Sequence, residues 1–156
     1  MTKKKEEEKK KVVSIYDAYA VDLDKESDGV WEDLAFLPGA KVLIARFGNP
    51  ASRKMMQRLQ KPYVKGMRAG RDIPDEIQED ILNKVIAKTI WIGWENIPVP
   101  NEAGEVVMLQ YSEENALFLL RDERLKDLRD EIVNLSRAAD LFKATADEEA
   151  IDNAKK

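Results

Sequence analysis

The strongest constraint in this sequence is a periodic run of apolar residues within the segment 111–142. After the polar turn Arg121-Asp122-Glu123, apolar side chains recur every three or four residues, at positions 125, 128, 132, 135, 139 and 142. This interval places them on one face of an α-helix, and Ser112 and Asp122 stand where N-caps are expected. The segment therefore predicts two capped amphipathic helices. The second is expected to pack one stripe on a core, because the run is too short for a coiled coil.

Another helical region is predicted to begin at Asn49-Pro50. Asn at the N-cap accepts a hydrogen bond from a free backbone amide, and Pro at the first helical position has no amide to leave unpaired. This helix is expected to bend or break at Pro62. A further helix is expected after Pro74, ending at about 93–97, and the segment 98–110 is expected to be a loop with a short hairpin.

The N-terminal part of the chain has the pattern of β-strands. Apolar and polar residues alternate over 13–23, and Asp28-Gly29 favours a tight hairpin turn. Further strand-like runs follow at 30–36 and 41–47. We therefore predict an α+β fold, with a small N-terminal antiparallel β-sheet followed by a mainly α-helical bundle.

The predicted organisation is a single domain with charged flanks, since 156 residues suit one domain. Residues 1–12 are predicted to be a disordered, charged N-terminus. Residues 13–143 are predicted to form the α+β domain, β-rich at 13–47 and helical at 50–143. Residues 144–156 are predicted to form a polar helical tail.

The composition excludes several classes of site. The chain contains no cysteine and no histidine, so disulfides, thiolate nucleophiles, Cys-ligated zinc and the commonest general base are absent. There is no glycine-rich phosphate loop, and the acid cluster at 22–28 lacks the spacing of a calcium-binding EF-hand. No window reaches the ~20 apolar residues that span a bilayer. We therefore expect a soluble, intracellular, non-enzymatic protein with no cofactor, no metal and no membrane segment.

Charge is segregated along the chain, although the net charge is only −4. Residues 17–33 hold seven acids and one base (1 − 7 = −6), residues 50–71 hold seven bases and no acid (+7), and residues 140–153 hold five acids and one base (1 − 5 = −4). Five of the bases recur at helical spacing on one face: Lys54, Arg58, Lys61, Lys65 and Arg68. An acidic block of the same chain or of another subunit is favoured as their partner over nucleic acid, because the overall charge is negative.

Two tryptophans complete the candidate partner-binding set. Trp91 and Trp94 flank Gly93 at the predicted end of a helix. Aromatic side chains at such a place either belong to the core or line a peptide-binding groove. We find no candidate catalytic, cofactor-binding or metal-binding residue.

Four stretches, in this order, together resemble tail assembly chaperones of long-tailed (siphovirus-type) bacteriophages over about residues 13–150. They are Asp28-Gly29-Val30-Trp31, then Ala45-Arg46-Phe47-Gly48-Asn49-Pro50, then Ile90-Trp91-Ile92-Gly93-Trp94-Glu95, and finally Tyr111-Ser112-Glu113-Glu114-Asn115-Ala116 with Leu119-Leu120 and Asp127-Leu128-Arg129. The sequence departs from the family pattern at Gly93, where an Asp is expected, and at Gln110, where a Pro is expected.

The resemblance implies a non-enzymatic role in virion assembly. Such chaperones bind the phage tape measure protein, keep it soluble and help tail-tube protein to polymerise around it. They act in the host cell cytoplasm and are absent from the mature virion. The family also makes longer forms by ribosomal frameshifting, and codons for Ala154-Lys155-Lys156 can form a slippery run. The separated charge blocks leave a homo-oligomer open as well.

Two other functions stay open from the sequence. One is a structural virion component, such as a tail or connector subunit. The other is a nucleic-acid-binding accessory protein that uses the basic helix at 53–71, which would make binding strongly salt-dependent.

Overall fold

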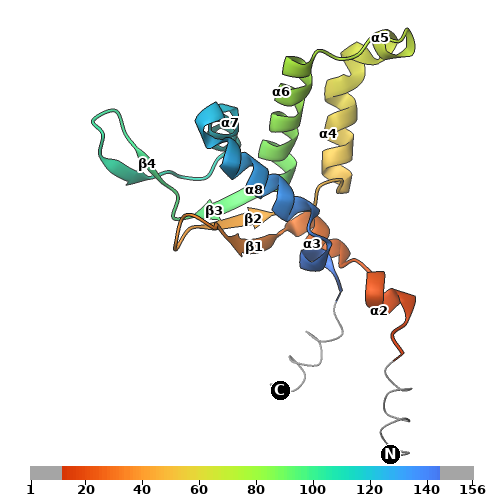
Figure 1. The fold of residues 1–156 in the computed structure, drawn as a ribbon, viewed down its shortest axis with the longest axis horizontal. Helices are drawn as coiled ribbons and strands as arrows, with labels where there is room; N and C mark the ends of the chain where they lie inside the picture. Colours follow the sequence, from red (N-terminus) through yellow and green to blue (C-terminus); the bar gives the residue numbers. More distant parts are fainter. Residues whose placement is uncertain (1–11, 145–156) are drawn as a thin grey trace, which may run out of the picture.

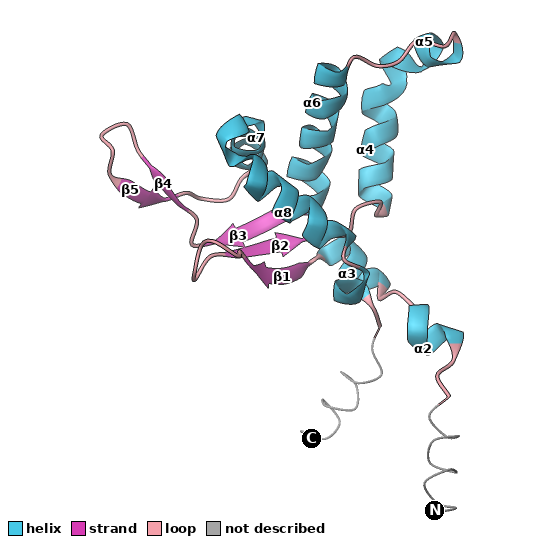
Figure 2. Ribbon diagram, in the orientation of Figure 1, coloured by secondary structure: helices cyan, strands magenta, loops and turns pink. Residues whose placement is uncertain are grey.

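The computed structural model describes residues 12–144, and in this part of the chain the fold is α+β (Figure 1). A small three-stranded sheet lies at the centre, and helices α7 and α8 lie over it. A helical hairpin of α4 and α6 extends from the sheet in one direction, with α5 at its tip, and a β-hairpin of β4 and β5 extends in another (Figure 2).

The central sheet is antiparallel throughout, in the order β1-β2-β3. Its strands are β1 (Val30–Asp33), β2 (Lys41–Ile44) and β3 (Trp91–Glu95). On the inner face, Val42 stands opposite Trp94, and both are buried. On the outer face, a Cβ at Gly93 would lie only 3.2 Å from the Cβ of Leu43. This close approach suits a residue without a side chain.

The predicted segregation of strands and helices is wrong, although the α+β class holds. Strand β3 comes from the segment predicted to end a helix, and it pairs with β2 to complete the sheet. The first predicted strand is instead helical, as α2 (Ile15–Tyr19) and α3 (Leu23–Asp28). Local capping explains this, because Ser14 and Asp17 form a capping box and the Asp22 side chain accepts from two backbone amides.

The hairpin of β1 and β2 and the hairpin of β4 and β5 are both where the sequence predicts them. The turn between β1 and β2 contains Pro38-Gly39, which lies between the strand-like runs at 30–36 and 41–47. Strands β4 (Pro98–Pro100) and β5 (Val106–Met108) pair in antiparallel fashion. Asp28-Gly29, by contrast, does not form a hairpin turn, because Gly29 is the C-cap of α3 with a φ of 86°.

The helical hairpin begins as predicted. Helix α4 (Pro50–Gln60) has Asn49 as N-cap, whose side-chain oxygen accepts a 2.9 Å hydrogen bond from the amide of Ser52. The α-helix is interrupted at Pro62 by a 3₁₀ turn, as predicted, and a second helix, α5 (Val64–Arg68), follows. Helix α6 (Asp75–Val85) returns along α4, and a π-helical turn (Ile86–Ile90) leads directly into β3.

The amphipathic pair at 111–142 is confirmed. It consists of α7 (Glu113–Arg121), a 3₁₀ turn (Glu123–Leu125), α8 (Lys126–Arg137) and a second 3₁₀ turn (Ala139–Phe142). Ser112 caps α7, and Asp122 caps the first 3₁₀ turn. The stripe packs on the core as far as Leu135, and its last position, Phe142, is completely buried. Ala139 is exposed because α8 has already ended.

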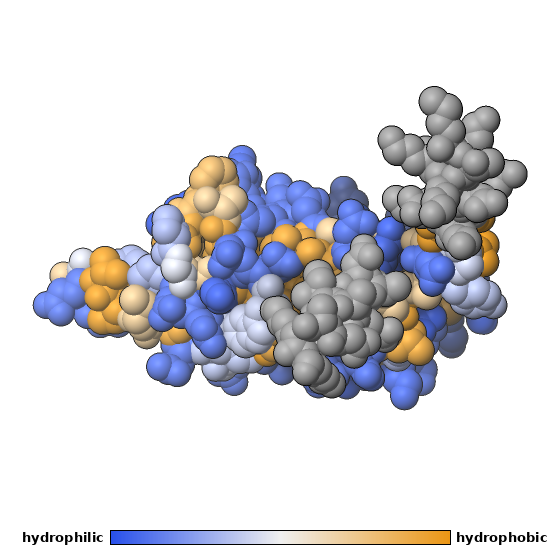
Figure 3. All heavy atoms as spheres, turned by 90° about the horizontal axis from the view of Figure 1, so that it is seen from below, coloured by the Kyte–Doolittle hydropathy of each residue, from blue (hydrophilic) through white to orange (hydrophobic). Residues whose placement is uncertain are grey.

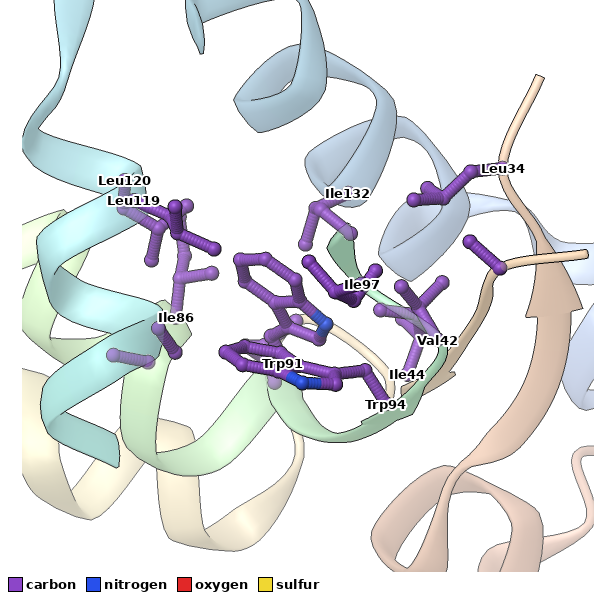
Figure 4. Close-up of a cluster of buried hydrophobic side chains, with 14 residues drawn as sticks. Leu34, Val42, Ile44, Ile86, Trp91, Trp94, Ile97, Leu119, Leu120 and Ile132 are labelled. Carbon is purple, nitrogen blue, oxygen red and sulfur yellow. The ribbon is translucent and has the colours of Figure 1, made fainter. Parts of the chain in front are cut away.

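The core lies between the inner face of the sheet and the helices above it (Figure 4). Trp91 and Ile132 are completely buried there. Side chains come from strand β3, the π-helical turn, α7 and α8. The sheet and its connections contribute Leu34, Ala40, Val42, Ile44, Trp94 and Ile97.

The segment between α2 and α3 meets the C-terminal end of the described chain beside the sheet. Val21 and Lys143 form an antiparallel bridge, and the amide of Asp22 donates a 2.8 Å hydrogen bond to the carbonyl of Phe142. The predicted disordered lead and helical tail, including the proposed frameshift position, lie outside the described residues except for Val12 and Ala144. Within residues 12–144, none of the helices has the length and apolar character of a membrane span.

Candidate partner-binding groove

An apolar hollow lies on the side of β4 and β5. It has a volume of about 920 Å³ and is lined by three separate parts of the sequence: the β1–β2 connection, the segment around β4, and the α7–α8 pair. We call it the apolar groove. Its apolar lining consists of Leu34, Phe36, Leu37, Ile97, Pro98, Val99, Pro100, Leu109, Phe118, Leu119, Leu125 and Leu128.

Two phenylalanines of the groove extend into solvent. Phe36 is 89% exposed and Phe118 is 71% exposed. Exposure of such large apolar side chains beside a concave apolar surface is typical of protein-binding sites, where aromatic side chains contribute most of the affinity. The groove therefore has both a hollow to receive apolar side chains and two aromatic contacts at its opening.

A carboxylate holds the wall that contains Phe36 in place. Both oxygens of Glu131, on α8, accept hydrogen bonds from the amide of Ala35, at 3.1 and 3.2 Å. The partners are 96 residues apart in the sequence. Because the bond joins the β1–β2 connection to α8, it fixes the position of one groove wall relative to the opposite one.

The groove is supported from below by an aromatic cluster. The ring centroids of Trp91 and Trp94 are 4.8 Å apart, and those of Trp94 and Tyr111 are 5.0 Å apart. The Trp94 indole N–H donates to the carbonyl of Leu109, at 2.8 Å, and Leu109 lines the groove. The Tyr111 hydroxyl donates to the carbonyl of Trp91, at 2.9 Å. Burial, and secondly the Glu113 carboxylate, raise the pKa of Tyr111.

The two predicted tryptophans are therefore core residues that support the groove without lining it. Trp91 is completely buried and Trp94 is 7% exposed. Figure 4 shows the two rings side by side among the aliphatic side chains of the core, and their planes are tilted by 49°. The indole nitrogen of Trp91 is buried and has no hydrogen-bond partner among the described residues.

The rim of the groove has a negative charge. Three acids and one base line it, namely Asp122, Asp127, Glu131 and Arg124, which sum to 1 − 3 = −2. The Asp122 carboxylate accepts two hydrogen bonds from the Arg124 guanidinium, at 2.8 and 3.0 Å. These bonds lower the pKa of Asp122. A partner with basic residues beside an apolar stripe would match this rim.

A polar clamp joins the helical hairpin to the groove side of the molecule. The Asp80 carboxylate on α6 accepts hydrogen bonds from Nε and Nη2 of Arg121 on α7, at 2.9 and 3.2 Å. It also forms a salt bridge with Lys84, at 3.2 Å. The hydrogen bond from Arg121 is the largest cause of the lowered pKa of Asp80. Arg129 on α8 donates a 2.7 Å hydrogen bond to Asn83. These charges have partners within the fold, so we assign the clamp a structural role.

The predicted basic face lies far from the groove. Lys54, Arg58, Lys61, Lys65 and Arg68 are all exposed on α4, α5 and the turn between them. No salt bridge joins any of the five to a described acid, so the expected pairing with the acidic block at 17–33 is absent within residues 12–144. In Figure 1 this face belongs to the protruding hairpin, away from β4. The structure thus separates the basic residues from the tryptophans.

Sequence reasoning missed the groove itself. Its aromatic residues, Phe36 and Phe118, belong to segments that are distant in the sequence, and neither carries a local motif. The only local sign was the apolar side chain of Phe36 beside the turn at Pro38-Gly39, where polar residues are usual.

A family model described as YdaY prophage protein matches residues 47–153. None of the curated proteins and none of the solved structures matches the chain. The matched range includes strand β3, helices α7 and α8, and every groove residue except those of the β1–β2 connection.

Proposed function

The chain belongs to the YdaY prophage protein family, and we propose that it is a non-enzymatic tail assembly chaperone that binds the tape measure protein in the apolar groove. The observation that carries this proposal is the open groove with Phe36 and Phe118 at its mouth. Prophage origin supports a role in building a phage particle. The assignment as a tail assembly chaperone draws on the resemblance of the sequence motifs to that family.

An amphipathic helix is the form of partner that suits the groove best. Such a helix places apolar side chains at intervals of three and four residues into an apolar hollow. The tape measure protein is long and helical, so another protein must shield its apolar stripes from solvent before the tail tube surrounds them. The acidic rim at Asp122, Asp127 and Glu131 favours stripes bordered by lysine or arginine.

The groove is open to solvent, which is compatible with release of the tape measure protein. We propose that its contacts with the groove are lost stepwise as tail-tube protein surrounds the helix. We propose that the chaperone acts in the host cytoplasm and is absent from the finished particle.

Coexpression with the tape measure protein of the same prophage tests this proposal. Phe36→Ser with Phe118→Ser should abolish co-purification and leave the tape measure protein insoluble, with the circular dichroism spectrum of the chaperone unchanged. Val106→Ser is a matched control, since Val106 is 71% exposed but does not line the groove. Equal binding by the groove variant and the control, or stoichiometric presence of the protein in purified particles, would contradict the proposal.

The exposed basic face supports a second candidate function, binding to nucleic acid. Five bases on one helical side with no described acid partner can contact successive phosphates. An electrophoretic mobility assay at several salt concentrations tests it. Binding that weakens steeply with salt and is lost in Lys54→Glu/Arg58→Glu would favour this candidate, and no binding at low salt would eliminate it.

A further inference from the structure

The hydrogen bonds of the β4–β5 hairpin determine which backbone groups point outward from it. At its two ends, the amide of Leu109 donates to the carbonyl of Ile97, and the amide of Asn101 donates to the carbonyl of Glu105, each at 2.8 Å. Hydrogen-bonded and non-hydrogen-bonded pairs of residues alternate along an antiparallel ladder. The residues next to these end pairs therefore point their amide and carbonyl groups away from the partner strand.

This alternation makes the two outer edges of the hairpin different. On β4 the outward positions are Pro98 and Pro100, and proline has no amide hydrogen to donate to a further strand. On β5 the outward positions are Val106 and Met108, which stand opposite those prolines. No backbone hydrogen bond joins their outward groups to any residue of the described part of the chain. The hairpin thus has a closed edge on β4 and an open edge on β5.

The open edge is also apolar and exposed. Val106, Val107 and Met108 keep 71%, 43% and 60% of their surface exposed. Figure 2 shows the hairpin extending away from the central sheet and the helices, and Figure 3 shows hydrophobic atoms near the left-hand end of the molecule, where the hairpin lies. Edge strands are usually protected by lysine, proline or a bulge. Strand β4 has its prolines, whereas β5 has none of these features.

We propose that β5 of one copy pairs with β5 of a second copy, antiparallel about a two-fold axis at Val107. The two hairpins then form one sheet in the order β4-β5-β5-β4. In this register Val106 stands opposite Met108 of the second copy, and the symmetry repeats the same pair on the other side of the axis. Since both residues point their backbone groups outward, every free amide and carbonyl of the open edge gains a partner.

A second copy suits this edge because its own fold supplies the required strand. Its β5 is already extended, exposed and free on the side that pairs, so no segment has to become ordered on binding. The side chains also match. On one face, Met108 lies between Pro98 of its own hairpin and Val106 of the second copy, and on the other face Val107 meets its own counterpart. Apolar neighbours across strands stabilise a sheet.

Charge does not oppose the pairing. The paired segment 106–108 contains no charged residue, and the charged residue nearest to it in the sequence is Glu105. In the proposed register, Glu105 stands opposite Leu109 of the second copy. The two copies of Glu105 therefore lie at opposite ends of the paired segment, about 13 Å apart along the strands. This separation exceeds the Debye length of about 8 Å at physiological ionic strength.

The contact should end at a dimer. Pairing uses the open edge of both copies, and the prolines of β4 close both outer edges of the new sheet. The paired segment is short, so the dimer should be weak and should depend on protein concentration. None of the three residues of β5 lines the apolar groove. The pairing therefore does not rest on the proposed function.

Proline substitution tests the backbone pairing. Val106→Pro/Met108→Pro gives β5 the same pattern that closes β4, and the lost amides have no acceptor within the hairpin, so the hairpin should persist. Sedimentation velocity over a series of concentrations should show a monomer–dimer equilibrium for the wild type. The proline variant should associate at least about tenfold more weakly. A wild type that stays monomeric at its highest soluble concentration, or a proline variant that dimerises like the wild type, overturns the proposal.

Charged substitutions test the register while they keep every backbone amide. Val106→Lys/Met108→Lys places lysine opposite lysine across the axis, and Val106→Glu/Met108→Glu places glutamate opposite glutamate. Each variant alone should therefore stay monomeric. An equal mixture should form a heterodimer, because each cross-strand pair then has opposite charges. A mixture that stays monomeric would contradict the pairing, even if the proline variant had failed to fold.

A matched control separates this contact from general effects of added charge. Ile15→Lys/Tyr19→Lys changes two side chains on α2 that are 72% and 76% exposed, similar to Val106. This control should dimerise like the wild type. Loss of dimerisation in the control, equal to the loss in the β5 variants, would show that the contact does not lie at the β5 edge.

Cysteine crosslinking locates the two-fold axis, since the chain has no native cysteine. The two copies of Val107 form a non-hydrogen-bonded pair with Cα atoms about 4.5 Å apart, which is within the range of a disulfide. Val107→Cys should form a disulfide-linked dimer on mild oxidation. Glu105→Cys should not, because its two copies are too far apart. Equal crosslinking of the two variants would overturn the proposed register.

Discussion

The apolar groove and the basic face differ in how the chain builds them. The groove is assembled from three segments that are far apart in the sequence, and bonds such as Glu131 to Ala35 hold its walls together. The basic face lies on one continuous stretch, α4 to α5, and its charges follow helical spacing. A site of the first kind depends on the whole core, whereas a site of the second kind needs only a helix. The two should therefore respond very differently to substitution.

The largest effect is expected in the core below the groove. Trp91→Ala removes a completely buried ring that contacts Trp94, and it should lower the free energy of unfolding by about 3–5 kcal/mol. Urea denaturation measures this change. A loss below about 1 kcal/mol would show that the groove does not depend on this packing.

The attachment of the helical hairpin should be the next most sensitive. Asn49 is 2% exposed, caps α4 and donates a 3.0 Å hydrogen bond to the carbonyl of Thr89. Asn49→Ala should cost about 1–3 kcal/mol, because it leaves a buried amide and a buried carbonyl without partners. Asn49→Asp is the matched comparison. It retains the cap but cannot donate to Thr89, so its thermal melting temperature should fall between those of the wild type and Asn49→Ala.

A smaller effect is expected from the clamp between the two regions, and it should depend on pH. Since the folded pKa of Asp80 lies below its ordinary value of 3.8, its pairing stabilises the fold above pH 3.8. That contribution is lost as the pH falls through the folded pKa. The side chains are partly exposed, so the contribution should stay below about 1 kcal/mol.

Comparison of the wild type with Asp80→Asn at several pH values measures this contribution. The two proteins should differ in stability at neutral pH and converge in acid. A difference that is the same at every pH would show that Asp80 acts through packing and not through its charge.

The smallest effect on stability is expected on the basic face. Lys54→Glu/Arg58→Glu changes two exposed residues without described ion pairs, so unfolding should shift by no more than about 0.5 kcal/mol. Chemical denaturation at low and high salt measures the shift. A large loss of stability would mean that the basic face packs more closely with the rest of the fold than its exposure indicates. The proposed difference in sensitivity between the basic face and the groove would then be wrong.

The helical signals of the sequence were reliable because they act over a few residues. The cap at Asn49, the break at Pro62 and the cap at Ser112 are all confirmed. Each depends on hydrogen bonds within one helical turn. The strand signal at 13–23 failed for the same reason. The capping box at Ser14 and the cap at Asp22 provide local bonds, whereas alternation alone provides no partner strand.

By itself, the sequence determined the capped helices, the charge of the basic face and the lack of cysteine and histidine chemistry. Only the tertiary structure decided that Trp91–Glu95 is a strand, because a strand is stabilised by its neighbour β2 and not by its own residues. It likewise decided where Phe36 and Phe118 stand relative to one another. Helix caps and surface charge are set by neighbours in the chain. Sheet pairing and the groove require contacts between distant segments, which no local pattern specifies.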